Sequence, residues 1–371
     1  MAERETKRQK ILDIRNLRIE LKGRRRERLT VVDGISLSVS RGETLGIVGE
    51  SGCGKSVLSL SMLGLLPKAM EISGGEIWYG EREGEAQPLH LLKPKELRKI
   101  RGREVAMVFQ DPMSSLNNSL TIGYQVTEGL RLHLGYSRQE AEAQAIELFR
   151  KVGLARPDKL LKEYPHQLSG GMRQRVMIAI AIACNPGLLI ADEPTTALDV
   201  TIQAQILEVM RQIRDQDGTS IVLISHDLGL IAEMCDRIAV MYAGRIVEEG
   251  SVADIFDRPR HPYTIGLLNS IPSPSHKGHR LHSIPGAVPG LHERAVGCTF
   301  APRCQYAMER CQTERPKLLP VGFGHTTSCF LVAEEGVKKG DNRNTADRAE
   351  GTGEVLYETG VAAEGTGAAS R

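Results

Sequence analysis

The sequence predicts an α/β fold with a mainly parallel core sheet. The first observation is a strand–loop–helix pattern: an apolar run, Thr44–Val48, precedes a glycine-rich loop and a helical pattern at 57–63. The second is that apolar runs of strand length alternate with helical patterns later in the chain. The runs lie at 188–191, 220–224 and 237–241, and the helical patterns at 201–216 and 228–235. This alternation is typical of parallel sheets that helices cover.

The bulk composition limits the class of protein. The chain has 371 residues, 41% hydrophobic and 25% charged, enough for two or more domains. Its net charge of +2 is too small to indicate a nucleic acid partner. No apolar run approaches the roughly 18 residues that a membrane span needs. The segment Met1–Arg8 is charged and lacks a following apolar run, so we expect no secretory signal and a cytosolic protein.

Further strands and helices are indicated before the glycine-rich loop and between that loop and the alternating elements. Residues 11–14 and 31–39 have the pattern of strands. The basic segment Lys22–Arg28 between them is interpreted as a solvated hairpin loop, and a phosphate-contacting patch is the alternative. Residues 96–165 are mostly helical in pattern.

The amino-acid composition of the chain changes near residue 257. Prolines and four of the seven cysteines gather in residues 258–334, which predicts a separate, loop-rich extension. In a cytosolic protein such cysteines indicate a metal site rather than disulfides. Residues 335–371 are rich in Gly, Ala, Thr and Glu, which predicts a disordered tail.

The glycine-rich loop Gly49–Ser56 fits the pattern G-x-x-x-x-G-K-[ST] without a mismatch. In such loops the backbone N–H groups and the positive end of the following helix bind phosphate oxygens. We expect Lys55 to reach the β- and γ-phosphates and the Ser56 hydroxyl to ligate Mg²⁺. The predicted nucleotide contacts of this loop are Gly49, Ser51, Gly52, Cys53, Gly54, Lys55, Ser56 and Val57.

Three predicted catalytic residues follow apolar strands. The run 188–191 ends in two acids: Asp192 is expected to hold Mg²⁺, and Glu193 to polarise the water that attacks the γ-phosphate. Gln110 ends the run 107–109 and is suited to contact Mg²⁺ or water and to relay a domain shift. His226 follows the run 220–224 and is expected to sense the γ-phosphate, because ligands collect at the carboxyl ends of strands.

The turn Ser169-Gly170-Gly171 opens a long apolar helix and predicts a second anion site. Two such sites in one domain cannot easily share one γ-phosphate. A head-to-tail dimer, in which each turn caps the nucleotide of the partner chain, resolves this conflict.

Together these motifs closely resemble the ATP-binding-cassette (ABC) ATPases over roughly residues 11–257. The matching segments are Walker A 49–56, Q-loop Gln110, signature 168–172, Walker B 188–193, D-loop 197–199 and H-loop His226. The resemblance implies a P-loop ATPase domain over residues 1–257, with an antiparallel β subdomain and a helical subdomain at about 111–170. Where this family stacks adenine on an aromatic side chain, the chain has Leu17, Ile19 and Leu21. Its signature ends in Met172 rather than the commoner Gln.

The extension narrows the resemblance. His261-Pro262-Tyr263-Thr264 and the segment Gly297–Cys304 resemble the C-terminal region of dipeptide/oligopeptide importer ATPases, up to about residue 333. This implies a peripheral subunit at the cytoplasmic face of the inner membrane that powers uptake of di- or oligopeptides. A nickel or other small-solute importer is an alternative. The implied partners are a second homologous ATPase in a heterodimer, two permeases and an external binding protein, with no nucleic acid.

Two functions from other classes are less consistent with the sequence. A soluble ABC ATPase of translation or DNA repair usually has two cassettes or an inserted coiled coil, and this chain has neither. A metal- or redox-sensing regulator that only binds ATP does not need all six intact ATPase motifs.

The four cysteines of the extension, Cys298, Cys304, Cys311 and Cys329, are separated by 5, 6 and 17 residues. Four thiolates suit a [4Fe–4S] cluster or Zn²⁺, and the tight C-x₂-C spacing of many zinc sites is absent. The family resemblance also implies iron–sulfur in some members. We predict a cluster, with Zn²⁺ or unligated thiols as alternatives, that stabilises this loop-rich segment.

Overall fold

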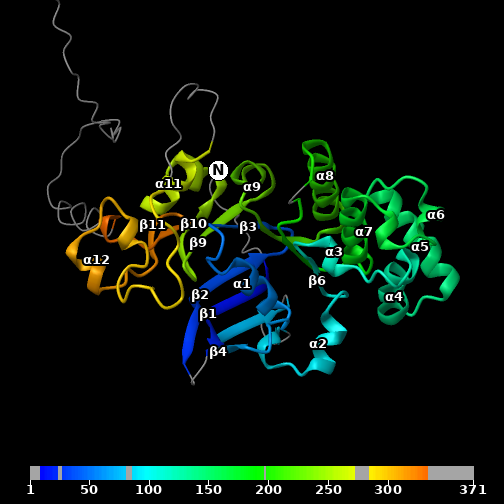
Figure 1. Cartoon of the computed structure of the whole chain (residues 1–371), viewed down its shortest axis with the longest axis horizontal. Helices are drawn as coiled ribbons and strands as arrows, with labels where there is room; N and C mark the ends of the chain where they lie inside the picture. Colours follow the sequence, from blue (N-terminus) through cyan, green and yellow to red (C-terminus); the bar gives the residue numbers. More distant parts are fainter. Residues whose placement is uncertain (1–8, 24–26, 81–85, 196–197, 272–283, 333–371) are drawn as a thin grey trace, which may run out of the picture.

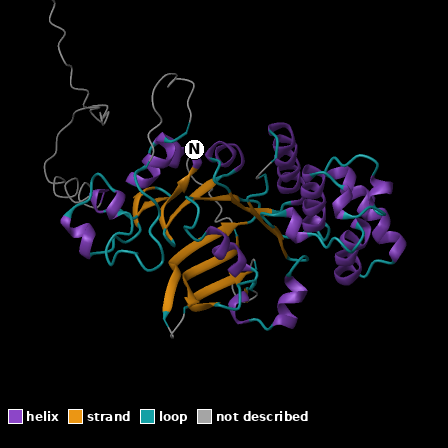
Figure 2. Cartoon of the chain, viewed as in Figure 1, coloured by secondary structure: helices purple, strands orange, loops and turns teal. Residues whose placement is uncertain are grey.

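A computed structural model describes residues 9–23, 27–80, 86–195, 198–271 and 284–332 (Figure 1). Figure 2 shows two sheets and the helices around them. The strands are β1 (Lys10–Lys22), β2 (Arg28–Ser40), β3 (Thr44–Val48), β4 (Met70–Tyr79), β5 (Gln87–Pro88), β6 (Val105–Val108), β7 (Leu188–Asp192), β8 (Ser220–Ile224), β9 (Arg237–Tyr242), β10 (Arg245–Ser251), β11 (Leu319–Gly322) and β12 (His325–Thr327). The helices are α1 (Lys55–Met62), α2 (Pro94–Ile100), α3 (Pro112–Ser115), α4 (Ile122–Leu134), α5 (Arg138–Lys151), α6 (Pro157–Leu160), α7 (Gly170–Ile182), α8 (Val200–Asp217), α9 (Leu228–Met234), α10 (Val252–Asp257), α11 (Pro262–Asn269) and α12 (Glu309–Thr313).

The large sheet has the strand order β11-β12-β10-β9-β3-β8-β7-β6. The strands β9, β3, β8, β7 and β6 pair in parallel, and β10, β12 and β11 continue the sheet in antiparallel fashion. The predicted α/β fold with a mainly parallel core is therefore confirmed. Because β3, β6, β7 and β8 run in one direction, their carboxyl ends meet at a single edge.

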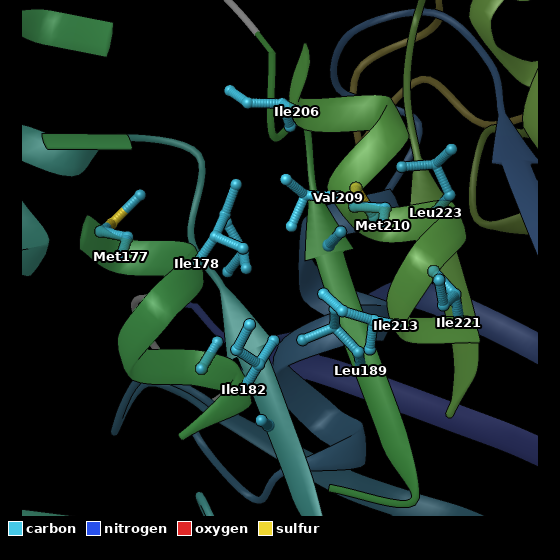
Figure 3. Packing of buried hydrophobic residues seen from close by; sticks show 14 of the residues in the cluster. Met177, Ile178, Ile182, Leu189, Ile206, Val209, Met210, Ile213, Ile221 and Leu223 are labelled. Atoms are coloured by element: carbon cyan, nitrogen blue, oxygen red, sulfur yellow. The ribbon is translucent and has the colours of Figure 1, made fainter. Parts of the chain in front are cut away.

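The alternation of side chains along each central strand produces two cores. On β8, Ile221 and Leu223 face one core and Val222 and Ile224 face the other. The first core lies against α7 and α8, where Ile178, Ile182, Ile206, Met210 and Ile213 meet Leu189, Ile221 and Leu223 (Figure 3). These central strands are apolar on both faces because helices cover one face and α1 with the small sheet covers the other.

The small sheet is antiparallel, with the order β2-β1-β4-β5, and lies below the large sheet in Figure 1. Its inner face shares the second core with Leu58 and Met62 of α1. Leu17 and Ile19 of β1, which lies between β2 and β4, belong to this core and are completely buried, at 0% exposure.

Helices α4, α5 and α6 gather at the end of the molecule opposite to α11 and α12 (Figure 1). Side-chain caps fix where the first two of them begin: the Thr121 hydroxyl accepts from Tyr124 N–H, and the Ser137 hydroxyl accepts from Glu140 N–H. Among the described helices, none combines the length and the apolar character needed to cross a membrane.

Several sequence-based expectations need correction. The predicted strand before Gln110 is β6, which lies within the mostly helical residues 96–165, whereas neither β4 nor β10 was predicted. The extension is not a separate appendage: β12 pairs with β10 through Glu248 and Thr327, so β11 and β12 enlarge the main sheet. The predicted disordered tail, residues 335–371, and the centre of the basic segment 22–28 lie outside the described residues.

Candidate nucleotide site

The loop Gly49–Ser56 connects β3 to α1 and wraps around the ammonium group of Lys55. Lys55 Nζ donates to the carbonyl oxygens of Gly49 at 2.6 Å and Glu50 at 3.2 Å, and the residue is only 6% exposed. Glycine is required at position 49, because a Cβ there would lie 2.1 Å from Met241 O. Gly54 has φ of 107°, a conformation that glycine adopts readily, and precedes the first turn of α1. The loop therefore holds a positive charge at the amino end of a helix, as phosphate binding requires.

Asp192 is buried at the end of β7 and has one carboxylate oxygen without a partner. Its Oδ2 accepts from Ser59 Oγ at 3.4 Å, whereas Oδ1 has no hydrogen-bond partner among the described residues. Burial raises the pKa of Asp192, and a hydrogen bond from Ser56 opposes that rise. A hard cation ligated by Asp192 Oδ1 and the Ser56 hydroxyl satisfies this orphaned oxygen. These two predicted ligands fit Mg²⁺.

Gln110, Glu193 and His226 come together although they follow three different strands, β6, β7 and β8. Gln110 Nε2 donates to Glu193 Oε2 at 3.0 Å, and His226 Nδ1 lies 3.4 Å from the same oxygen. Glu193 has φ of 48°, which is uncommon for a residue with a side chain, and its N–H donates to Ile224 O at 2.9 Å. This strained turn holds the carboxylate between the two other side chains.

The turn Ser169-Gly170-Gly171 forms the start of α7, where Ser169 Oγ accepts from Met172 N–H. It lines a pocket together with Leu198 and Asp199, which precede α8. Among the described residues that line this pocket, none belongs to the phosphate loop 49–56. In Figure 1, α7 lies in the helical part of the molecule, apart from α1. The structure therefore does not bring the two predicted anion sites together, and Ala197 of the D-loop lies outside the described residues.

Gln174 is a site residue that the sequence analysis missed. Its Nε2 donates to Pro194 O at 2.6 Å, and the residue is 3% exposed. It thus connects α7 to the turn that follows Glu193. Its neighbours Arg173 and Arg175 are also polar, so no local pattern distinguishes the one buried side chain of the three.

The structure shows which of the three aliphatic residues at the expected adenine position are accessible to a base. Leu17 and Ile19 are completely buried, so neither can contact a base. Leu21 alone of the three is partly exposed, near the end of β1 and opposite Leu29 of β2. An aliphatic contact of this kind lacks the stacking that an aromatic ring provides.

The four cysteines of the extension line one pocket, together with aromatic side chains that include Phe300 and Phe330. Cys298 N–H donates to Cys311 O at 2.8 Å, which joins two of the cysteine backbones. Burial raises the pKa of the Cys329 thiol to about 11. Among the described residues, however, no group of three or more His, Cys, Asp or Glu side chains is arranged to hold a metal ion. The thiols suit a soft metal chemically, but their arrangement does not support the predicted metal site.

Comparisons with known proteins agree with the ATPase motifs and with the extension. Residues 32–196 match the family "ABC transporter", and residues 247–311 match "Oligopeptide/dipeptide transporter, C-terminal region". The oligopeptide transport ATP-binding protein AppD of Bacillus subtilis is 50% identical over 329 residues, covering 89% of this chain and 99% of AppD. The dipeptide transport ATP-binding protein DppD of Escherichia coli is 49% identical over 304 residues, covering 82% of this chain and 91% of DppD.

Solved structures give the same result for the ATPase core. The ATP-binding cassette MJ0796, in a dimeric post-hydrolysis state bound to ADP and Pi, has 28% identity and a TM-score of 0.58 over 65% of this chain and 98% of that chain. The cassette cbiO1 of Clostridium perfringens, part of the transporter complex cbiONQ, has 25% identity and a TM-score of 0.56, covering 67% of this chain and 92% of that chain. The chain therefore belongs to the ABC transporter family, as a member of its group of oligopeptide and dipeptide transport ATP-binding proteins.

Proposed function

We propose that this ABC ATPase powers uptake of di- or oligopeptides through a membrane importer. The observation that carries the peptide assignment is the similarity to AppD and DppD, which continues through the extension and covers nearly the whole length of both relatives. Both relatives are named as peptide transport proteins, and we extend that role to this chain.

The residues at the sheet edge have distinct proposed roles in ATP hydrolysis. Lys55 binds the β- and γ-phosphates, while Ser56, Asp192 and Gln110 hold the metal. When bound, Mg²⁺ neutralises charge on the phosphate oxygens. Glu193 orients the attacking water and accepts its proton, since its carboxylate is already fixed at 3.0 Å from Gln110 Nε2.

His226 has a further proposed role beside Glu193. Its Nδ1 lies 3.4 Å from Glu193 Oε2, and its side chain is 63% exposed. From this position the ring can contact the γ-phosphate while it keeps the carboxylate in place. His226 therefore links the presence of a γ-phosphate to the orientation of the residue that activates water.

The second half of the site comes from another chain in this proposal. The Ser169–Gly171 turn lines a pocket that includes no residue of the loop 49–56, which supports a role in capping the nucleotide of a partner ATPase. We propose a heterodimer with a homologous ATPase, bound to two permeases at the cytoplasmic face of the inner membrane and served by an external binding protein. ATP binding closes the dimer, hydrolysis reopens it, and Gln110 relays the movement to the permeases.

The peptide assignment is tested by transport in cells that lack this chain. Uptake of a labelled dipeptide and of labelled Ni²⁺ is measured after complementation with the wild-type chain or with Lys55→Ala. We expect only the wild-type chain to restore dipeptide uptake. Restored Ni²⁺ uptake without dipeptide uptake supports the nickel alternative and contradicts the peptide assignment.

We also propose that Cys298, Cys304, Cys311 and Cys329 bind a [4Fe–4S] cluster. The four thiols line one pocket, and four cysteine thiolates are the usual ligands of such a cluster, which supports this proposal, although the side chains must rearrange from their described positions to bind it. Anaerobically purified protein should show the broad visible absorption of iron–sulfur proteins and about four iron atoms per chain. Cys304→Ser should lower the iron content. Zinc alone, or no metal at all, in the wild-type protein contradicts the cluster.

A further inference from the structure

Glu50, the second residue of the phosphate loop, is gripped by a side chain of the extension. Both terminal nitrogens of Arg303 donate to the Glu50 carboxylate, at 2.9 Å to Oε1 and 3.1 Å to Oε2. Parallel two-point pairs of this kind are the strongest and most directional ion pairs. The Arg303 side chain is 6% exposed and that of Glu50 is 29% exposed, so solvent screens the pair only in part.

The backbone of Glu50 is held by a second residue of the extension. Glu50 N–H donates to the Tyr263 hydroxyl at 2.9 Å. Tyr263 is completely buried, at 0% exposure. Its ring packs against Tyr242 of β9 and Phe300 of the extension, with centroid distances of 4.6 and 5.4 Å. The first turn of the phosphate loop thus rests on a rigid aromatic cluster rather than on solvent.

Arg303 is fixed by contacts that do not involve Glu50. Its Nε donates to Pro285 O at 2.8 Å, and its guanidinium lies 5.8 Å from the centroid of the Tyr242 ring. Longer contacts to the carbonyl oxygens of Ile284 and Gly286, at 3.4 and 3.3 Å, and to the Tyr242 hydroxyl, at 3.4 Å, add to these. These contacts orient the Arg303 guanidinium, and its two terminal nitrogens therefore determine where the Glu50 carboxylate lies.

We propose that Arg303 and Tyr263 are positioning residues for ATP binding, which act through Glu50. The loop binds phosphate with backbone N–H groups, so a loop held in one conformation loses less entropy when ATP binds. Arg303 also neutralises a carboxylate that otherwise repels the triphosphate. This inference rests on the proposed binding of ATP by residues 49–56, and it gives the extension a part in the nucleotide site.

The test is equilibrium binding of the non-hydrolysable analogue AMP-PNP, with Mg²⁺, to the full-length chain. Arg303→Met is expected to raise the Kd about three- to tenfold. Tyr263→Phe, which removes a single oxygen atom, is expected to raise it by a smaller factor. Adding Glu50→Gln to Arg303→Met should recover part of the affinity, because the amide does not repel phosphate. In the assembled transporter, Arg303→Met should raise the KM for ATP more than it lowers kcat.

A matched control is available in a second ion pair between the extension and the core. Arg315 Nη1 donates to Asp33 Oδ2 of β2 at 2.7 Å, and this arginine has no contact with the phosphate loop among the interactions of the described residues. Arg315→Met should leave the Kd unchanged. An equal rise in Kd for Arg315→Met and Arg303→Met overturns the inference, because general docking of the extension then accounts for both.

The remaining outcomes separate this inference from the proposed nucleotide site. An unchanged Kd in a folded Arg303→Met variant, or in Tyr263→Phe if the arginine variant does not fold, shows that the extension does not position the loop. Failure of the wild-type chain to bind the analogue, or unchanged binding by Lys55→Ala, instead contradicts the proposed role of residues 49–56.

Discussion

Replacing Glu193 by Gln removes the proposed proton acceptor and changes little else in the site. Glutamine has nearly the same size and the same backbone requirements, so the strained φ of 48° is not relieved. Its side-chain oxygen can still accept from Gln110 Nε2, now at 3.0 Å from Glu193 Oε2. What is lost is the ability to take a proton from water. The substitution therefore changes the chemistry of the site more than its structure.

The magnitude follows from the role of a general base. A positioned base contributes about 10²- to 10⁴-fold to the rate, equivalent to about 3–5 kcal/mol of activation free energy. We expect a fall of this size in the steady-state rate of phosphate release by the assembled transporter. The KM for ATP should change little, because Glu193 is not among the residues proposed to bind phosphate or the metal.

Asp192→Asn provides the comparison for this experiment. Asp192 Oδ1 is the buried oxygen that has no partner among the described residues, and it is the proposed Mg²⁺ ligand. Asp192→Asn should therefore weaken binding of Mg–ATP, whereas Glu193→Gln should retain ATP without turnover. A Glu193→Gln transporter that hydrolyses ATP at the wild-type rate refutes the assignment of Glu193 as the base.

Two further predictions concern stability. Ile213 is completely buried where α8 meets β7 and β8 (Figure 3), so Ile213→Ala should lower the free energy of unfolding by about 2–5 kcal/mol in urea titrations, and a loss under about 1 kcal/mol contradicts the described packing. Burial lowers the pKa of His261 to about 4, so below pH 6.5 the unfolded chain gains a proton that the folded chain does not. Stability should therefore fall as the pH decreases from 6.5 towards 4, by about 2 kcal/mol at pH 5, and His261→Asn, which keeps an acceptor for Tyr263 N–H, should remove that fall. An identical pH dependence of urea unfolding in wild-type and His261→Asn protein contradicts this reasoning.

The central strands β3, β7 and β8 could be predicted from the sequence because every residue in them is buried. The predicted strand 220–224 has the same bounds as β8, and all five of its residues are buried. By contrast, β4 contains Ser73, Gly74 and Gly75, and its pairing with β1 is interrupted by register shifts. Its sequence therefore lacks a continuous apolar run or a strict alternation. Similarly, β12 pairs with β10 across a long stretch of chain, and no local pattern signals such a pairing.

Some site residues could likewise be predicted from the sequence, and others could not. Gln110, Glu193 and His226 could be predicted to lie together because each follows a strand, and parallel strands bring their carboxyl ends to one edge. The pair of Glu50 and Arg303 could not be predicted. Arg303 ends a three-residue 3-10 helix, 253 positions from Glu50, where neither periodicity nor a motif marks a partner. Long-range contacts between two loops depend on the completed fold, and the sequence carries no local sign of them.

The buried carboxylate of Glu248 holds the extension against the sheet that carries the candidate nucleotide site. Glu248 of β10 is completely buried and accepts from the backbone N–H groups of Arg260 and His261 at 2.6 and 2.9 Å, and its Oε1 lies 2.8 Å from His325 Nε2. Lifting the extension away from β10 breaks all three contacts, and this loss opposes its release. The extension is therefore anchored on β10, next to the strand β9 that supplies Tyr242 beneath Arg303. Because this anchor lies outside the phosphate loop, Arg303 and Tyr263 can hold Glu50 in place while Lys55 exchanges its carbonyl partners for phosphate.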